Sequence, residues 1–526
     1  MKERVKMSKT KRMGRSRNFD TRIVRIRTEN NGMGYFKTLI VLIAVALQLA
    51  AMVMLYLFLM NVFRWYVFVS LAFSIIACVH VLSTDKNGQS KAVWVMLLLL
   101  GFSVGFVLYW LSDVRVFFGR AKKRYAGIFE RTERYKPLKS AAKVSKQSES
   151  MSVLLENMGG FRAYNNTRQQ YFSSGAQLFD DVLERIKSAE KFVFIEFFII
   201  ADGILLERML KVLGPKAQSG VDVRIIYDDL GSGRMLKRKT RKRIRKMGIK
   251  LEAFNRITPR FTVAMNYRDH RKIIIVDGKT AYTGGSNLAD EYVNEKRMHG
   301  YWKDNGLRLD GEAVDAFTLT FLRQWEFTTR QKTEYDGYLG LYEPIESTAA
   351  VVPYADGLDY EKAVGKGAFA HLISTAKERL WIMTPYFVPD DTVMGLIADR
   401  AQAGVDVRII LPWVPDKPYV YAVSRDNADR IIPQGVKVYL MKNSFVHSKT
   451  MLTESGAIIG SINLDLRSFY QQFECAVFTD DMGVLKQLED DYNSTFADSV
   501  SVDKEKKKNI FKRMITGFLR IFEPLM

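Results

Sequence analysis

Two histidines occupy the same local pattern in different parts of the chain. His270 is followed two residues later by Lys272, and His447 is followed two residues later by Lys449. Alternate residues of a β-strand face the same way, so each histidine and lysine should project from one face. A neutral imidazole can act as a nucleophile or a base, and an ammonium group stabilises negative charge. The two pairs therefore suit chemistry on a tetrahedral phosphate.

An asparagine follows each pair at nearly the same distance. Asn287 ends the stretch 284–287, and Asn463 ends the stretch 460–463, which also contains Ser461. After a turn and a returning strand, each asparagine can bring an amide donor to its histidine. A single His-x-Lys pair would most often be an ordinary feature of a surface strand, but two copies with matching asparagines favour a functional site.

The chain also contains an internal repeat, which explains why the pattern occurs twice. Residues 217–226 and 401–410 agree at nine of ten positions, and further matching segments keep nearly the same offset. From about residue 151, short β-rich runs alternate with polar helical stretches, which indicates an α/β fold. We expect two equivalent halves, 151–345 and 346–500, related by a pseudo-two-fold axis. Each half would carry one His-Lys pair.

These residues resemble the paired His-x-Lys-x4-Asp motifs of the phospholipase D superfamily. The similar stretches are 195–198, 266–272 and 290–291 in the first half, and 384–389, 460–468 and 473–474 in the second. The resemblance implies two phospholipase D-like α/β sandwich halves that form one active site. It further implies a phosphatidyl transfer in two steps, without a metal or a cofactor.

The resemblance assigns a role to each motif residue. It makes His270 the nucleophile that forms a phosphohistidine, and His447 the acid that protonates the leaving group and then the base. The groups expected to stabilise charge on the phosphate are Lys272, Lys449, Asn287 and Asn463. We place Ser461 and Glu474 with the two asparagines as substrate-binding residues. Glu474 is also our choice to orient an imidazole, with Glu196 as a second choice.

The third motif residue differs between the halves. Asp277 stands five residues after Lys272, but the corresponding position after Lys449 is Glu454, and the interval from histidine to asparagine is one residue shorter there. Either Glu454 substitutes for the aspartate or the second acid is absent. We include Asp277 and Glu454 with the catalytic set, as supports of the motif.

Three uncharged apolar runs precede the duplicated body, at 38–60, 65–83 and 92–112. Each is long enough to cross a bilayer as a helix, so 38–112 should hold two or three transmembrane helices. The basic tail 1–37 and the basic start of the linker 113–150 both favour the cytoplasmic side, which three full crossings cannot satisfy. The shortest run, 65–83, is then the best choice for a re-entrant segment. We favour a multi-pass protein of the cell membrane with a cytoplasmic catalytic region.

The charge of the chain points to an anionic partner. The formal net charge is +22, and the run 237–246 holds eight basic residues in ten. This run is a solvated helix face, a face held against anionic membrane lipids, or a nucleic-acid site; beside membrane segments we prefer the lipids and expect no nucleic acid. Residues 501–526 predict a basic amphipathic helix that docks on the protein's own core or lies at the membrane interface. The 2 Cys and 5 His show no zinc-like spacing.

The order of membrane segments and duplicated body is similar to that of bacterial cardiolipin synthases. That similarity implies phosphatidylglycerol as both donor and acceptor, with cardiolipin and glycerol as products. Three alternatives remain at this stage. Water as acceptor would give a phospholipase D-type hydrolase, the basic run would serve a membrane-anchored nuclease, and the altered second motif would fit a non-catalytic membrane scaffold.

Overall fold

The computed structural model describes residues 43, 45–58, 64–84, 88–112, 114–135, 144–146, 148–256, 267–343, 345–357, 363–502, 510–520 and 522–523. The basic tail 1–37 lies outside these residues. The chain divides into two compact units, one formed by Met1–Lys86 with Trp94–Tyr109 and the other by Asn87–Val93 with Trp110–Met526. The first unit holds the apolar segments, and the second holds the duplicated body.

The apolar unit is helical. Its described helices include α2 (Arg64–Ser83) and α3 (Gly88–Ser112), which share a small core and a hydrogen bond of 2.6 Å between Tyr66 and Ser103. One helix among the described residues, Trp65–Ser83, is long and apolar enough to cross a membrane, while Val45–Phe58 and Ser90–Gly101 are shorter. The run that we expected to be re-entrant is therefore the continuous candidate span. Three crossings are not confirmed.

The duplicated body contains two large sheets whose strand orders correspond one to one. The first sheet has the order β1 (Thr167–Phe172), β9 (Gly306–Gly311), β7 (Thr280–Gly284), β6 (Lys272–Val276), β2 (Phe192–Phe197), β3 (Asp222–Asp228), β4 (Lys250–Phe254). The second has the order β10 (Val351–Ala355), β20 (Cys475–Thr479), β17 (Ala457–Gly460), β16 (Thr450–Thr453), β11 (Arg379–Met383), β13 (Asp406–Pro412), β14 (Lys437–Met441), β21 (Ser499–Ser501). The predicted duplication is thus seen in the topology, with β21 as an addition.

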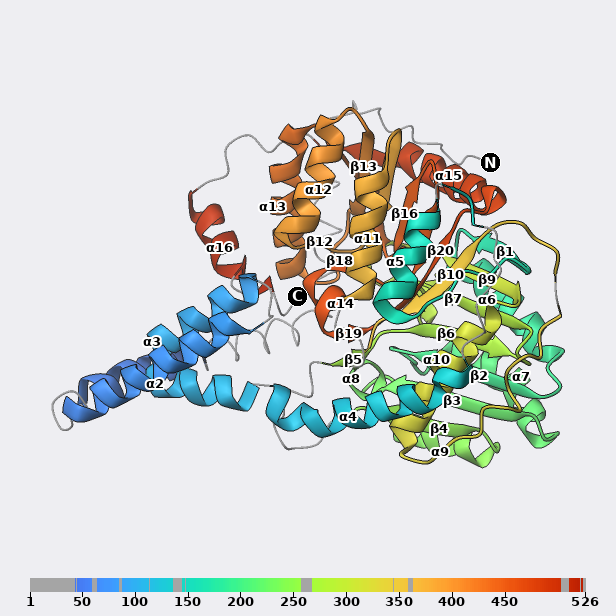
Figure 1. The fold of residues 1–526 in the computed structure, drawn as a ribbon, viewed down its shortest axis with the longest axis horizontal. Helices are drawn as coiled ribbons and strands as arrows, with labels where there is room; N and C mark the ends of the chain where they lie inside the picture. Colours follow the sequence, from blue (N-terminus) through green and yellow to red (C-terminus); the bar gives the residue numbers. More distant parts are fainter. Residues whose placement is uncertain are drawn as a thin grey trace, which may run out of the picture. The chain divides into compact units, whose positions relative to one another are not determined.

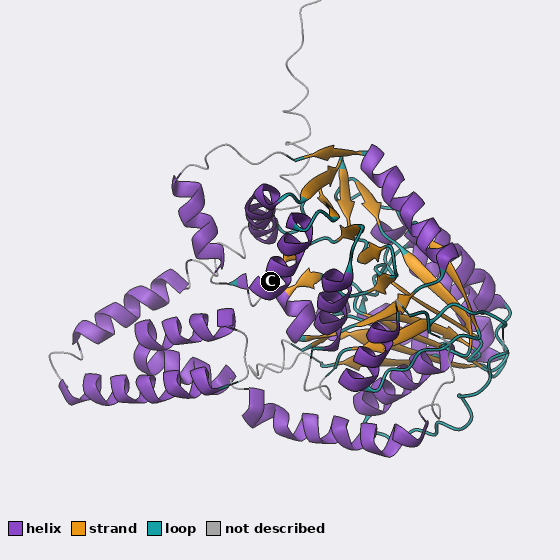
Figure 2. Cartoon of the chain, turned by 45° about the horizontal axis from the view of Figure 1, so that its top comes forward, coloured by secondary structure: helices purple, strands orange, loops and turns teal. Residues whose placement is uncertain are grey.

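The two sheets share one central core and each has an outer core of its own (Figures 1 and 2). Strand β2 lies between the central core and the outer core of its half, so it is buried on both faces. Phe192 and Phe194 face the central core together with Trp381 of the other sheet, whereas Val193 and Ile195 face the helices of their own half. A strand covered on both sides is apolar throughout rather than alternating, and this one follows that rule.

Helices cover the outer faces and fill the space between the sheets. The outer helices are α6 (Gly175–Lys187), α7 (Ile204–Gln218) and α9 (Arg238–Lys246) in the first half, and α11 (Val364–Thr375), α12 (Asp391–Gln402) and α13 (Pro418–Ile431) in the second. Helices α10 (Val314–Thr329) and α15 (Met482–Ala497) contribute to the central core. α10 is buried along most of its length, and its buried residues include Arg323 and Glu326, which are paired by hydrogen bonds, beside the apolar ones.

The stretch that we expected to be a linker contains a packed helix. α4 (Val114–Thr132) lies against α10, with Tyr125 and Ile128 in the central core. Arg323 of α10 donates to the Thr132 hydroxyl at 2.7 Å. The stretch therefore continues the folded body, and α5 (Glu149–Gly159) then packs on α11.

The C-terminal helix α16 (Ile510–Arg520) is docked along one edge only. Leu519 packs on the apolar cluster of Val388, Val420 and Val423, and Arg520 pairs with Asp426 of α13. The large apolar side chains left exposed on it are Phe511, Met514, Ile515 and Phe518. One edge of α16 therefore meets the protein, and its apolar face is exposed.

Candidate active site

Each motif histidine is positioned by a short strand from the opposite half. β5 (Arg268–Asp269) pairs in parallel with β19 (Gln472–Phe473), and β15 (Ser444–Val446) pairs in parallel with β8 (Tyr301–Lys303). The next residue of each motif continues the contact. His270 N–H donates to the Phe473 carbonyl at 2.8 Å, and His447 N–H donates to the Lys303 carbonyl at 2.7 Å. The site therefore exists only where the two halves meet.

The contact between the halves also supplies a carboxylate to each imidazole. Glu474 lies 2.9 and 3.0 Å from His270 Nδ1, and Asp304 lies 2.8 Å from His447 Nδ1. All four side chains are buried. A carboxylate on Nδ1 fixes the ring and leaves Nε2 for the reaction. The choice of Glu474 over Glu196 as the orienting group agrees with this geometry.

Asp304 was missed in the sequence. It holds the place before β9 that Glu474 holds before β20, and the two acids are the only feature that the short stretches 303–305 and 473–475 share. The repeat alignment, carried as far as these strands, was the signal that would have found it.

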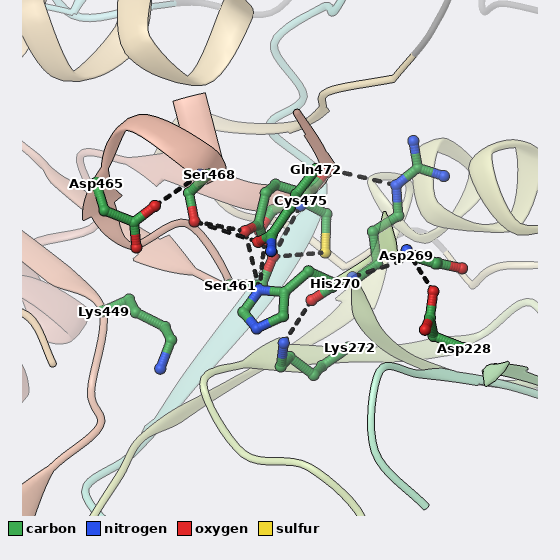
Figure 3. A network of polar contacts seen from close by, with 12 residues as sticks. Asp228, Asp269, His270, Lys272, Lys449, Ser461, Asp465, Ser468, Gln472 and Cys475 are labelled. Carbon is green, nitrogen blue, oxygen red and sulfur yellow. Dashed lines mark hydrogen bonds and ion pairs between the residues drawn. The ribbon is translucent and has the colours of Figure 1, made fainter. Parts of the chain in front are cut away.

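Ser461, which we expected to bind substrate, is buried and engaged within the protein. Its hydroxyl donates to Glu474, which also accepts a hydrogen bond of 2.9 Å from Ser468 (Figure 3). The matching residue in the first half is Gly285, where an added Cβ would lie 2.1 Å from an Asp304 oxygen. One half thus combines the longer acid Glu474 with the donor Ser461. The other half has the shorter acid Asp304 and Gly285 at the matching positions.

Both motif lysines are buried next to the histidines. The Lys272 and Lys449 ammonium groups each donate to the backbone carbonyl of their own motif histidine, and Lys449 Nζ is 2.8 Å from His447 Nδ1. Burial lowers the pKa of Lys272 to about 8 and the pKa of Lys449 to about 7. Figure 3 shows the two lysines, which come from different halves, near the His270 ring.

The environment keeps the imidazoles neutral. Burial is the main cause that lowers the pKa of His447 to about 4, and the charge of Lys449 lowers it further against the effect of Asp304. Burial also lowers the pKa of His270 well below its usual value, with Lys272 and Lys449 adding to the effect. Because both lysines act on one histidine, the two motifs converge on one place. A neutral imidazole beside cations can attack an anionic phosphorus centre.

The two asparagines differ in their engagement. The Asn287 amide accepts from Ile199 N–H at 3.0 Å and donates to the Tyr292 hydroxyl at 2.7 Å. Asn463 is equally buried, but its Oδ1 has no hydrogen-bond partner within the described residues. Asn287 thus orders the loop after β2, whereas Asn463 keeps its Oδ1 acceptor open among the described residues.

Asp277 and Glu454 lie at the opposite ends of their strands and bind backbone instead of an imidazole. Asp277 accepts from the N–H groups of 190–192 at 2.7–2.8 Å, and Glu454 accepts from those of 377–379 at 2.9–3.4 Å. These backbone contacts fit acids that support the motif. The extra methylene of Glu454 makes up for the shorter second turn, so the second acid is present in function.

Two other side chains, Glu196 and His371, have contacts of their own away from the imidazoles. Glu196 is buried beside Arg271, at 3.7 Å, and makes no contact with either imidazole that would orient it. His371 is 2.9 Å from the Ser150 hydroxyl, where α11 meets α5, which agrees with a structural role. Among the described residues, no three His, Cys, Asp or Glu side chains gather as metal ligands would.

Comparisons with known proteins agree with this geometry. A family model described as cardiolipin synthase, PLD-like domain, matches residues 182–321 and 369–496. Cardiolipin synthase 2 of Staphylococcus epidermidis is 32% identical over 461 residues, covering 84% of this chain and 94% of that protein. Cardiolipin synthase of Staphylococcus aureus is 32% identical over 459 residues, covering 84% and 92%.

Two other similarities complete the picture. An uncharacterized protein of Streptococcus mutans is 38% identical over 382 residues, or 72% of this chain and 82% of that protein. The crystal structure of phosphatidylserine synthase from Haemophilus influenzae superposes with a TM-score of 0.54 at 15% identity, over 72% of this chain and 98% of that one. This last likeness concerns the fold alone.

Proposed function

The chain belongs to the cardiolipin synthase family of the phospholipase D superfamily, and on that premise we propose that it joins two phosphatidylglycerol molecules into cardiolipin and releases glycerol. One observation carries the proposal beyond the family. Each His-x-Lys pair is buried, and each histidine is oriented through Nδ1 by a carboxylate of the opposite half. This arrangement provides one nucleophile and one acid-base group on a single phosphate.

In the first step, His270 Nε2 attacks the phosphorus of the donor lipid. The new N–P bond replaces the P–O bond to glycerol, and His447 gives its Nε2 proton to the departing alkoxide. The bound phosphate adds a negative charge that opposes the lysines and raises the proton affinity of His447. The groups that stabilise the non-bridging oxygens are Lys272, Lys449 and the Asn463 amide.

In the second step, His447 is neutral and acts as a base. It takes the proton from a hydroxyl of the acceptor lipid, whose oxygen attacks phosphorus. The N–P bond breaks, its electron pair returns to the His270 imidazole, and both side chains are restored. Asp304 and Glu474 act as positioning residues in both steps.

We further propose that the protein is a multi-pass membrane protein with its catalytic body on the cytoplasmic side. The candidate span Trp65–Ser83 and the twelve Lys/Arg of residues 1–37 support this arrangement. The basic helix α9 and the open apolar face of α16 would then lie on an anionic lipid surface.

The proposal is tested with the purified full chain in phosphatidylglycerol vesicles. We expect cardiolipin and glycerol in equal amounts, and loss of both products in H270A and in H447A. H371A is the matched control and should keep the wild-type rate, because His371 lies outside the site. Phosphatidic acid as the sole lipid product would identify a hydrolase, and cleavage of an oligonucleotide without lipid turnover would identify a nuclease.

A further inference from the structure

The proposed reaction requires the site to treat two identical lipids differently. The donor phosphate lies between the histidines, where the motif lysines stabilise it. The acceptor brings a second phosphate, which is separated from the attacking hydroxyl by the three carbons of its glycerol. A second anion so close to the first favours an additional cation outside the two motifs. Such a cation would be a lysine or arginine at the rim of the site that neither motif contains.

The second half places an aromatic ring beside Asn463. β12 (Phe387–Val388) pairs in parallel with β18 (Leu464–Asp465), with Phe387 opposite Leu464. Tyr386 directly precedes the first strand and Asn463 directly precedes the second, so the two are neighbours across this ladder. Tyr386 therefore lies next to Asn463 of the active site.

Lys417 lies on that ring. Its Nζ is 4.7 Å from the centroid of Tyr386, and the Tyr386 hydroxyl donates to Asp416, which holds the ring in place. Lys417 is exposed, and it precedes Pro418, the first residue of the 14-residue helix α13. The positive end of that helix adds to the attraction for an anion.

Electrostatics place the Lys417 ammonium within reach of the chemistry. Its charge is one of the causes that lower the pKa of His270, and it also lowers the pKa of the buried Asp465, which burial raises. Asp416 and Asp465 are the acids that face it, and both already accept hydrogen bonds, from Tyr386 and from the Ser468 N–H. Among the described residues, the contact found for the Lys417 ammonium is the one with the Tyr386 ring, so its donors stay available for a third group.

The first half does not repeat this pair. The bridge between Ile200 and Leu288 corresponds to the contact between Phe387 and Leu464, which puts Ile199 in the place of Tyr386. An isoleucine provides neither an aromatic face for a cation nor a hydroxyl. The two sides of the site therefore differ next to their asparagines.

We propose that Lys417, supported by Tyr386, binds the phosphate of the acceptor phospholipid and so favours a lipid over water as acceptor. The second half is then the acceptor side of the site. The inference rests on the proposed function and deepens it. The acceptor phosphate keeps its bonds throughout, while its glycerol hydroxyl gives the proton to His447 and displaces His270 from phosphorus.

The test compares transfer with hydrolysis in one assay. Full-length K417A in phosphatidylglycerol vesicles should lower the ratio of cardiolipin to phosphatidic acid by roughly tenfold, the effect of losing one hydrogen bond to a charged group. K417R keeps the cation and should stay within about twofold of the wild type. K486A removes an exposed lysine of α15 and should leave the ratio unchanged.

A neutral acceptor separates acceptor binding from the chemical steps. Exchange of labelled glycerol into phosphatidylglycerol uses the same histidines but an acceptor without a phosphate, so K417A should retain it. An unchanged product ratio in K417A would overturn the inference, and so would an equal loss of cardiolipin formation and glycerol exchange. A wild-type protein that forms no cardiolipin would refute the proposed function itself, before any variant is compared.

Discussion

The carboxylates that orient His270 and His447 differ in the other hydrogen bonds that they accept. Glu474 accepts hydrogen bonds from Ser461 and Ser468 as well as from His270, whereas Asp304 accepts from His447 and from the Asn305 N–H at 2.9 Å. Hydroxyl donors draw negative charge away from the ring that a carboxylate supports. The two histidines therefore differ in their surroundings even though their motifs are alike.

Removing either charge should slow the reaction without weakening lipid binding. We expect E474Q and D304N each to lower kcat by about 100-fold or more, with KM changed by less than about threefold, because the imidazole loses its orientation. Steady-state kinetics on phosphatidylglycerol vesicles measure both constants. A D304N protein with the wild-type kcat would show that Asp304 has no positioning role.

The lowered pKa values predict an acidic working range for the free enzyme. The ammonium groups of Lys449 and Lys272 lose their protons as the pH rises through about 7 and about 8, so kcat/KM should fall on the alkaline side. On the acid side, kcat/KM should fall as the His270 imidazole, whose pKa burial lowers well below its usual value, takes up a proton and can no longer attack phosphorus. A pH profile of kcat/KM checks this, and a flat profile up to pH 9 would contradict it.

At the scale of elements, the two large sheets are predictable from the sequence, but some of the contacts between the halves are not. The repeat predicts two sheets with equivalent strands. The spacing of His270 and Lys272 predicts that both side chains project from the same face of a strand. The contact between β5 and β19 is not predictable, because two-residue strands leave no periodic pattern in a sequence. The roles of Asp304 and Ser461 also depend on contacts between segments that lie far apart in the sequence.

The acid at the end of each motif strand should contribute to stability. D277A leaves three backbone N–H groups at the start of β2 without their acceptor, so we expect the free energy of unfolding to fall by about 2 kcal/mol. E454A should have a smaller effect, because its contacts are longer. Denaturant unfolding in detergent measures both changes.

Glu343 offers the matched control for this series. It pairs with Lys279 on the surface, where water and salt screen the pair, so E343A should leave the free energy of unfolding close to the wild-type value. If D277A abolished transfer while its stability stayed at the wild-type level, Asp277 would belong to the chemistry after all.

At the scale of the whole molecule, helix α9 carries part of the excess positive charge. Ile244 is the buried residue of α9, and most of its Lys and Arg side chains are exposed. The run was predicted as a lipid-facing surface, and its position on the outside of the first half is compatible with that proposal. The apolar face of α16 gives the membrane proposal a second, independent element.

A labelling experiment tests the position of α16 in the reconstituted protein. The cysteines of the chain, Cys78 and Cys475, are buried, so a spin label on F518C should be selective. We expect this label to be reached by oxygen dissolved in the lipid and protected from an aqueous relaxing agent. A label on K486C should show the opposite behaviour. Equal aqueous exposure of both labels would exclude α16 from the membrane interface.

The crossed support of the histidines has a consequence for how such a chain evolves. A half that holds the other half's imidazole gains nothing from its own motif alone, so an ancestor of half the length had to work as a pair of identical copies. In such a pair, every substitution appears twice. In a single chain the two halves can differ, and here Tyr386 with Lys417 stands on one side and Ile199 on the other.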